Sequence, residues 1–178
     1  RLPQGIPAVT MALGGVLSYL YDTQKTDLSY INTLDYYEQG QFMELDIAAR
    51  RNLELTETLR SKEKRGSLLW VLDKTKTPMG SRCLRAFLER PLLSPAAIAR
   101  RQHAVGALVD NTMAREELIL ALTGMGDMER LISRIVYGTA GGRDLTALRA
   151  AIEKLPAVAQ QLRPFTSGRL GELSREMD

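Results

Sequence analysis

Apolar residues recur every three or four positions over the first segment of the chain, the spacing of an amphipathic helix. They are Val9, Leu13, Val16, Leu17 and Leu20. The pattern predicts a helix over residues 7–23, with Pro7 in its first turn. Gly14 and Gly15 weaken the middle of this helix by about 1 kcal/mol each relative to Ala, but glycines also let another element approach closely. We therefore expect a core helix that packs tightly.

The period shortens between residues 30 and 56, where β-branched and aromatic side chains alternate with turn residues. This region predicts three short strands, of which the second is 42–45 and the third is 52–56. Between these two, Asp46 is placed to cap a single helical turn over 47–51. We expect a small two- to three-stranded sheet near the N-terminal third. Its first strand contains Ile31, Thr33, Leu34, Tyr36 and Tyr37.

From Ser67 onwards the spacing is helical again, and a residue that favours a helix start precedes each apolar run. The last run predicts one helix from Asp144 through Leu155, and the polar stretch 168–178 favours the start of another. Short connections between helices are typical of an antiparallel bundle or a stacked array, so the expected fold class is mainly α. The start signals are Ser67, Thr77–Pro78, Ser94–Pro95, Asn111, Asp127 and Asp144.

Composition narrows the class of protein. The 178 residues suffice for one domain with a real core, and 44% hydrophobic with 25% charged residues is close to the globular average. A single cysteine, Cys83, and a single histidine, His103, exclude an internal disulfide and a Cys/His metal site, and we expect Cys83 to be buried. No apolar run reaches the ~20 residues that cross a bilayer. The chain begins with neither a signal peptide nor Met, so we interpret it as a piece of a longer protein.

The net charge of +3 is mild. The basic clusters, 62–65 and Arg100–Arg101, are short, and an acid interrupts the first of them. Proteins that bind duplex nucleic acid usually concentrate their positive charge much more strongly. The clusters are therefore interpreted as solvated faces, with contact to nucleic acid as the alternative.

The residue pattern indicates no catalytic constellation. His103 lies on a polar stretch, away from the apolar helix face that carries Cys83, and acidic pairs such as Glu116–Glu117 are ordinary surface pairs. None of the 14 glycines is followed by Lys, so a P-loop is absent from the chain. The glycine-rich segments 124–126 and 138–142 follow predicted helices, which favours helix ends over phosphate binding. We expect no enzyme activity.

One ordered series of motifs is specific as a set. Its motifs are Asp46–Thr56, Ser67–Asp73, Thr77–Arg82, Leu84–Arg85, Arg90–Leu92, Asp127–Leu131 and Arg143–Leu145. In this order the series closely resembles the core (lever) domain of the MutS family of bacterial DNA mismatch-repair proteins, over Ala8 to about Leu162.

The resemblance implies a structural and allosteric core that links the binding of mismatched DNA to the binding of ATP. In that family, other domains read the mismatch, form a connector, clamp the DNA and hydrolyse ATP with Mg. The resemblance also implies a homodimer whose partners include MutL and the replication clamp. The resemblance implies that 1–178 is a single core fragment with three parts. They are the end of a preceding linker over 1–6, a helix plus small sheet over 7–66, and a helical part over 67–178 that is truncated near the clamp insertion. The implied location is the bacterial cytoplasm, at the nucleoid and away from membranes.

The family's ATP site and its mismatch-reading Phe-x-Glu motif belong to domains other than the core. Two Phe-x-Glu tripeptides occur here, at 42–44 and 87–89, but both stand in the wrong place, and Phe42 and Phe87 are expected to be core residues. No catalytic, ATP-binding, DNA-binding or metal-binding residue is therefore assigned, and no cofactor is expected in this chain.

One segment is a candidate interdomain joint. It comprises Thr77, Pro78, Met79, Gly80, Ser81 and Arg82, where Gly80 close to Pro78 lets other backbone approach. A well-capped helix start with packing value only is the alternative interpretation of these residues. For the whole chain, the alternative is a stand-alone helical module that binds nucleic acid or another protein.

Overall fold

The computed structural model describes residues 7–24, 31 and 40–177. The chain divides into two compact units, 1–39 and 40–178. In the first unit, helix α1 spans Pro7–Gln24, which confirms the predicted helix. Among the described residues, no heavy atom other than those of the nearby helix backbone lies within 4 Å of a Cβ added at Gly14 or Gly15, so the tight packing of α1 stays a prediction.

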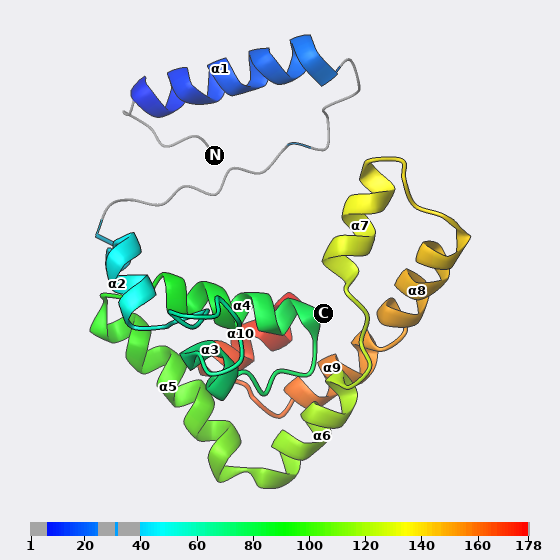
Figure 1. Cartoon of the computed structure of the whole chain (residues 1–178). Coiled ribbons are helices and arrows are strands. Elements are labelled where there is room, and N and C mark those ends of the chain that lie inside the picture. Colours follow the sequence, from blue (N-terminus) through cyan, green and yellow to red (C-terminus); the bar gives the residue numbers. More distant parts are fainter. Residues whose placement is uncertain (1–6, 25–30, 32–39, 178) are drawn as a thin grey trace. The chain divides into compact units, whose positions relative to one another are not determined.

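The second unit is built from helices, which confirms a mainly α fold (Figure 1). Asp46, Ser67, Thr77, Ser94, Asn111 and Asp127 act as N-caps, each accepting a hydrogen bond from the backbone N–H three residues on. The helices are α2 (Ile47–Asn52), α3 (Leu68–Leu72), α4 (Pro78–Glu89), α5 (Pro95–Asp110), α6 (Thr112–Leu122), α7 (Met128–Val136), α8 (Gly142–Ile152), α9 (Leu155–Leu162) and α10 (Gly168–Glu176).

The predicted helix from Asp144 through Leu155 is wrong in two respects. The N-cap of α8 is Gly141, and Asp144 lies in the first turn, where its carboxylate accepts the Gly141 N–H at 2.9 Å. The helix also ends at Ile152, and α9 begins at Leu155. Pro156 explains the break, because a proline inside a continuous helix has no N–H to donate and its ring clashes with the preceding turn.

The predicted sheet is also wrong in the described part of the chain. Phe42 forms one isolated antiparallel bridge with Leu92, and the rest of 42–45 has no strand partner. Residues 52–56 form the end of α2 and a turn, in which Glu54 has a φ of +46°. The N-cap at Asp46 favours the helix α2, and this local signal outweighs the alternation of side chains that predicts strands. The first predicted strand, apart from Ile31, lies outside the described residues.

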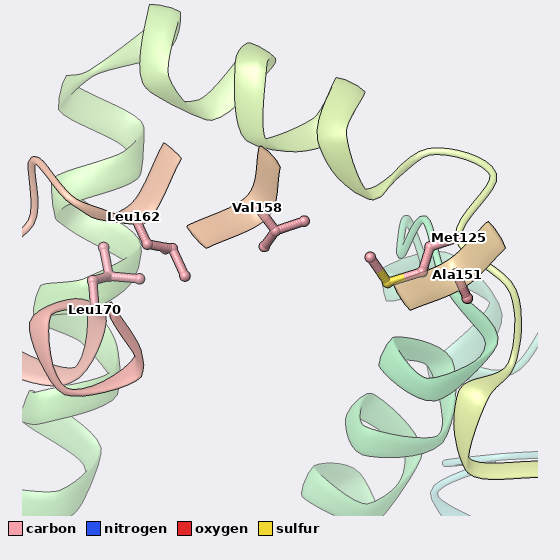
Figure 2. Close-up of a cluster of buried hydrophobic side chains, with 5 residues drawn as sticks. All are labelled: Met125, Ala151, Val158, Leu162 and Leu170. Carbon is pink, nitrogen blue, oxygen red and sulfur yellow. The ribbon is translucent and has the colours of Figure 1, made fainter. Parts of the chain in front are cut away.

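The core of the second unit gathers around α9. Its buried side chains come from the loop after α6 and from α8, α9 and α10, and Figure 2 shows Leu162 beside Leu170 and Met125 beside Ala151. Helices α5, α6, α9 and α10 pack on one another around it, whereas α7 packs chiefly on α8 (Figure 1). The cluster consists of Met125, Ala151, Val158, Leu162 and Leu170, each less than a tenth exposed.

Three burial predictions need correction. Cys83 is exposed, and Phe87 is 42% exposed, so neither is a core residue. Phe42 is only partly buried. Phe87 is instead covered on one side by the guanidinium of Arg101, whose central carbon lies 3.7 Å from the ring centroid. An apolar stripe at helical spacing thus marks a contact face, but here part of that face contacts a cation rather than the core.

The glycine-rich segments do end helices, as predicted. Gly124 follows α6 with a φ of +71°, and Gly138 follows α7 with a φ of +67°. Both values lie in the left-handed region that glycine adopts without strain. Among the described helices, none is long and apolar enough to span a membrane.

Candidate functional site

The predicted joint begins with a well-formed helix cap. The Thr77 hydroxyl oxygen accepts the Gly80 N–H at 3.0 Å, and Pro78 occupies the first helical position of α4. A Cβ added at Gly80 would lie 3.0 Å from the Thr77 hydroxyl and 3.3 Å from the Thr75 Cβ. A side chain at position 80 would therefore press on the side chains of Thr75 and Thr77, which are local neighbours, whereas the sequence predicted the approach of other backbone.

Asp73 ties this helix start to the chain before it. Its carboxylate, at the C-cap of α3, accepts hydrogen bonds from the Lys64 ammonium, the Thr75 hydroxyl and the Ser81 hydroxyl, each at 2.6 Å. The bond from Lys64, followed by those from Ser81 and Thr75, holds the pKa of Asp73 far below its usual range. One side chain, 11% exposed, thus joins α3, α4 and the loop that precedes them.

The start of α3 is itself anchored. Ser67 is fully buried; its hydroxyl donates to the Lys64 carbonyl at 2.7 Å and accepts the Trp70 N–H at 3.2 Å. The Leu68 and Leu69 N–H groups donate to the carbonyls of residues 54 and 55. A continuous set of polar contacts therefore joins three elements: the segment after α2, helix α3 and the start of α4.

Arg82 connects α4 to α7 across the fold. Its two terminal nitrogens donate to the two carboxylate oxygens of Asp127 at 2.7 and 2.8 Å, and its Nε donates to Glu129 at 3.1 Å. Asp127 is the N-cap of α7 and also accepts the Arg130 N–H at 3.2 Å. A planar guanidinium that holds one carboxylate in this bidentate manner fixes direction as well as distance.

The electrostatics of this contact are mutual. Hydrogen bonds from Arg82, the largest cause, and from the Arg130 N–H together lower the pKa of Asp127 to about 2. The same two carboxylates, Asp127 before Glu129, raise the pKa of Arg82 above its usual range. The guanidinium side chain is 46% exposed, so the contact is open to water and salt.

The hairpin formed by α7 and α8 has a narrow base. The Lys154 ammonium donates to the Thr123 carbonyl at 2.7 Å, and a Cβ added at Gly126 would lie 3.8 Å from that of Ala151. Farther out, Arg134 on α7 pairs with Asp144 on α8 at 2.8 Å. The chain therefore enters and leaves the hairpin at neighbouring points, and Arg82 contacts the hairpin beside its point of entry.

This geometry contains no metal-binding constellation in the described residues, where no group of three or more His, Cys, Asp or Glu side chains converges. The family described as MutS domain III matches residues 48–177. The chain belongs to this family.

Curated relatives agree with the family. The DNA mismatch repair protein MutS of Lachnoclostridium phytofermentans is 47% identical over 167 residues, which cover 94% of this chain and 18% of that protein. Its counterpart in Desulforamulus reducens is 46% identical over 172 residues, which cover 97% of this chain and 20% of that protein. The chain thus spans about a fifth of the length of these curated relatives.

Within this MutS domain III chain, the predicted joint residues fall into four roles. Thr77 and Pro78 start α4, Gly80 leaves room for the side chains of Thr75 and Thr77, and Met79 packs against the core cluster. Ser81 and Arg82 make the contacts to other elements, which the sequence alone did not pair. Their partners are Asp73, Asp127 and Glu129; each stands in one of the motifs that carried the resemblance, but nothing in local spacing indicated which residues would meet.

Proposed function

We propose that this chain is the structural and allosteric core of a DNA mismatch-repair protein, and that it links the binding of mismatched DNA to the binding of ATP. In this proposal the chain neither reads the mismatch, nor binds ATP, nor catalyses a reaction. It transmits movement between the domain that reads the mismatch and the domain that binds and hydrolyses ATP. Membership of the MutS domain III family and the similarity to proteins named DNA mismatch repair protein MutS support the mismatch-repair setting.

The observation that carries the mechanical role is the Arg82 contact. Transmission between two sites requires an element with two arrangements that each site favours differently. In this proposal the hairpin α7–α8 is that element, a choice supported by its packing chiefly on itself and its narrow base on the body. Arg82 then sets its direction through Asp127, the first residue of the hairpin. Rotation of the hairpin as a rigid body would exchange this contact for another.

The partners follow from the same proposal. The chain would contact connector, clamp and ATPase domains of its own protein, which would act as a homodimer on mismatched duplex DNA and engage MutL. ATP or ADP and Mg would bind to the ATPase domain and not to this chain. The site of action would be the bacterial cytoplasm, at the nucleoid.

The test uses the mismatch-repair protein that contains this domain. Arg82→Gln removes the bidentate contact, and Asp127→Asn removes the charge while retaining an N-cap residue. We expect both variants to bind mismatched DNA. On addition of ATP they should release it at least about fivefold more slowly, because the coupling between the DNA site and the ATP site falls. Gly80→Val is a third probe, acting on the turn rather than on the contact.

The matched control is Arg149→Gln, which breaks the exposed pair between Arg149 and Glu153 on α8. It should leave ATP-triggered release unchanged. Release at the wild-type rate in Arg82→Gln and Asp127→Asn, with unchanged thermal stability, would remove the joint from the proposal and leave α4 with a capped helix start only.

A further inference from the structure

A second surface, which uses none of the joint residues, carries an excess of positive charge. A hollow of about 270 Å³ is lined by the guanidinium-bearing side chains Arg100 and Arg101 of α5 and Arg169 of α10, together with Leu92 and Ala97. Helices α5 and α10 pack directly on each other, so the three arginines come from two packed helices.

The internal carboxylates do not neutralise this hollow. Glu172 is shared, since it accepts from Arg100 and, at 3.2 Å, from Arg169. Glu176 lies 3.5 Å from Arg169 and is largely exposed. Arg101 pairs with no carboxylate in the described part of the chain; its partner is the ring of Phe87. A guanidinium held in place on an aromatic ring keeps most of its donors for another group.

Apolar surface adjoins the arginines. Leu92 and Ala97 line the hollow, Phe87 beneath Arg101 is 42% exposed, and Leu93, next to Leu92, is 44% exposed. Arginine and aromatic residues beside aliphatic ones are enriched at protein interfaces, where they carry much of the binding energy. A DNA backbone is instead contacted by charged and polar donors spread along a strongly basic face, whereas this chain has a net charge of only +3.

We propose that this hollow docks an acidic segment of protein. A carboxylate of the segment enters the hollow and accepts hydrogen bonds from Arg100 and Arg101, and an adjacent apolar side chain covers Leu92 and Phe87. Charge complementarity fixes the position of the carboxylate, while burial of the aromatic and aliphatic surface supplies affinity.

The experiment measures fluorescence anisotropy with the chain 1–178 at physiological salt. The probe is a short labelled peptide that alternates glutamates with leucines, and its counterpart carries glutamine in place of every glutamate. A labelled DNA duplex is the third probe. We expect the acidic peptide to bind and both other probes to bind at least about tenfold more weakly.

Variants assign the binding to the hollow. Arg101→Gln should weaken the acidic peptide about tenfold, as loss of a central interface arginine does. Glu172→Gln should have the opposite effect and tighten the peptide severalfold, because it frees Arg100 and Arg169 from their shared internal carboxylate. Arg149→Gln, on α8, is the matched control and should leave affinity unchanged. Thermal melting of each variant verifies that the fold is retained.

Three outcomes would overturn the proposal. They are absence of acidic-peptide binding, equal binding of the glutamine counterpart, and tighter binding of the DNA duplex that is lost in Arg101→Gln. None of these outcomes bears on ATP-triggered release through Arg82, so the docking surface and the joint stand or fall separately.

Discussion

The two parts of the second unit hold together by different means. Around α9, the contacts are apolar: Val158 and Leu162 are about one-twentieth exposed and pack against neighbouring helices. Between α4 and α7, the contact is ionic: the half-exposed Arg82 holds Asp127 and Glu129. Apolar packing contributes much to the free energy of unfolding and is almost insensitive to salt, whereas exposed ion pairs contribute little and are screened but strongly directional. Apolar packing thus stabilises the helices around α9, and a directional ion pair orients the α7–α8 hairpin.

The largest expected effect comes from the apolar region. Leu162→Ala should lower the free energy of unfolding by about 2 to 5 kcal/mol, because it leaves a cavity in the core around α9. Urea denaturation measures the change. The matched control is Leu120→Ala on α6, where the side chain is 73% exposed, and its effect should stay within about 0.5 kcal/mol. Equal effects of the two changes would contradict the position of the core.

Backbone contact in the same region gives the next effect. A Cβ added at Gly171 would lie 2.6 Å from the carbonyl carbon of Thr166, so α10 would have to shift. Gly171→Ala should cost about 1 to 3 kcal/mol. Gly106→Ala in α5, where an added Cβ meets no heavy atom of the described residues within 4 Å, should instead stabilise the chain by about 0.5 to 1 kcal/mol. The prediction is the opposite sign of two identical substitutions, read from thermal melts.

The polar network at Asp73 should contribute less. Asp73→Asn removes the charge that Lys64, Ser81 and Thr75 stabilise, with an expected loss of about 1 to 2 kcal/mol at neutral pH. Because the pKa is lowered in the folded state, this contribution is full above the ordinary value, declines as the pH falls below that value and is lost only below the lowered folded-state pKa. Denaturation at about pH 7 and about pH 2 should show the two proteins converging in acid. If the free energies of unfolding of the two proteins differed equally at both pH values, the charge of Asp73 would not be the source of its contribution.

The smallest effect on stability is expected at the joint itself. Arg82→Gln should destabilise the chain only slightly, and added salt should abolish the difference. Its clearest signal is the Asp127 titration followed by NMR, in which the pKa should rise from about 2 towards 3.8 when Arg82 is lost. The ion pair therefore stabilises the fold at pH values above that range and is lost as the pH falls through it. An unchanged titration would show that Arg82 does not hold Asp127 in solution.

Local contacts in this fold were predictable from the sequence, and contacts between distant segments were not. Helix starts were predictable, since a cap such as Thr77 or Asp127 acts on residues three positions away. The contact between Arg82 and Asp127 was not predictable, because 45 positions separate the two residues and the fold alone brings them together. Asp144 shows the limit of local signals: an aspartate suits both the cap and the first turn of a helix, and only the structure distinguishes them.

Burial was harder to predict than helix position. The apolar face of α4 was identified, but periodicity gives the direction of a face and not what covers it. Phe87 therefore contacts Arg101 rather than the core, and Cys83 is exposed. The sheet prediction failed for a similar reason, since alternation over 52–56 fits a turn that follows α2 as well as it fits a strand.

The narrow base of the α7–α8 hairpin has an evolutionary consequence. Its chain enters at Gly126 and leaves at Ala151, which are close neighbours, while its tip over 137–141 is largely exposed. Residues inserted at that tip lengthen the hairpin without stretching any connection of the body. The hairpin can thus change length between species, or accept a fused reporter domain, while the helices around α9 keep their sequence and their packing.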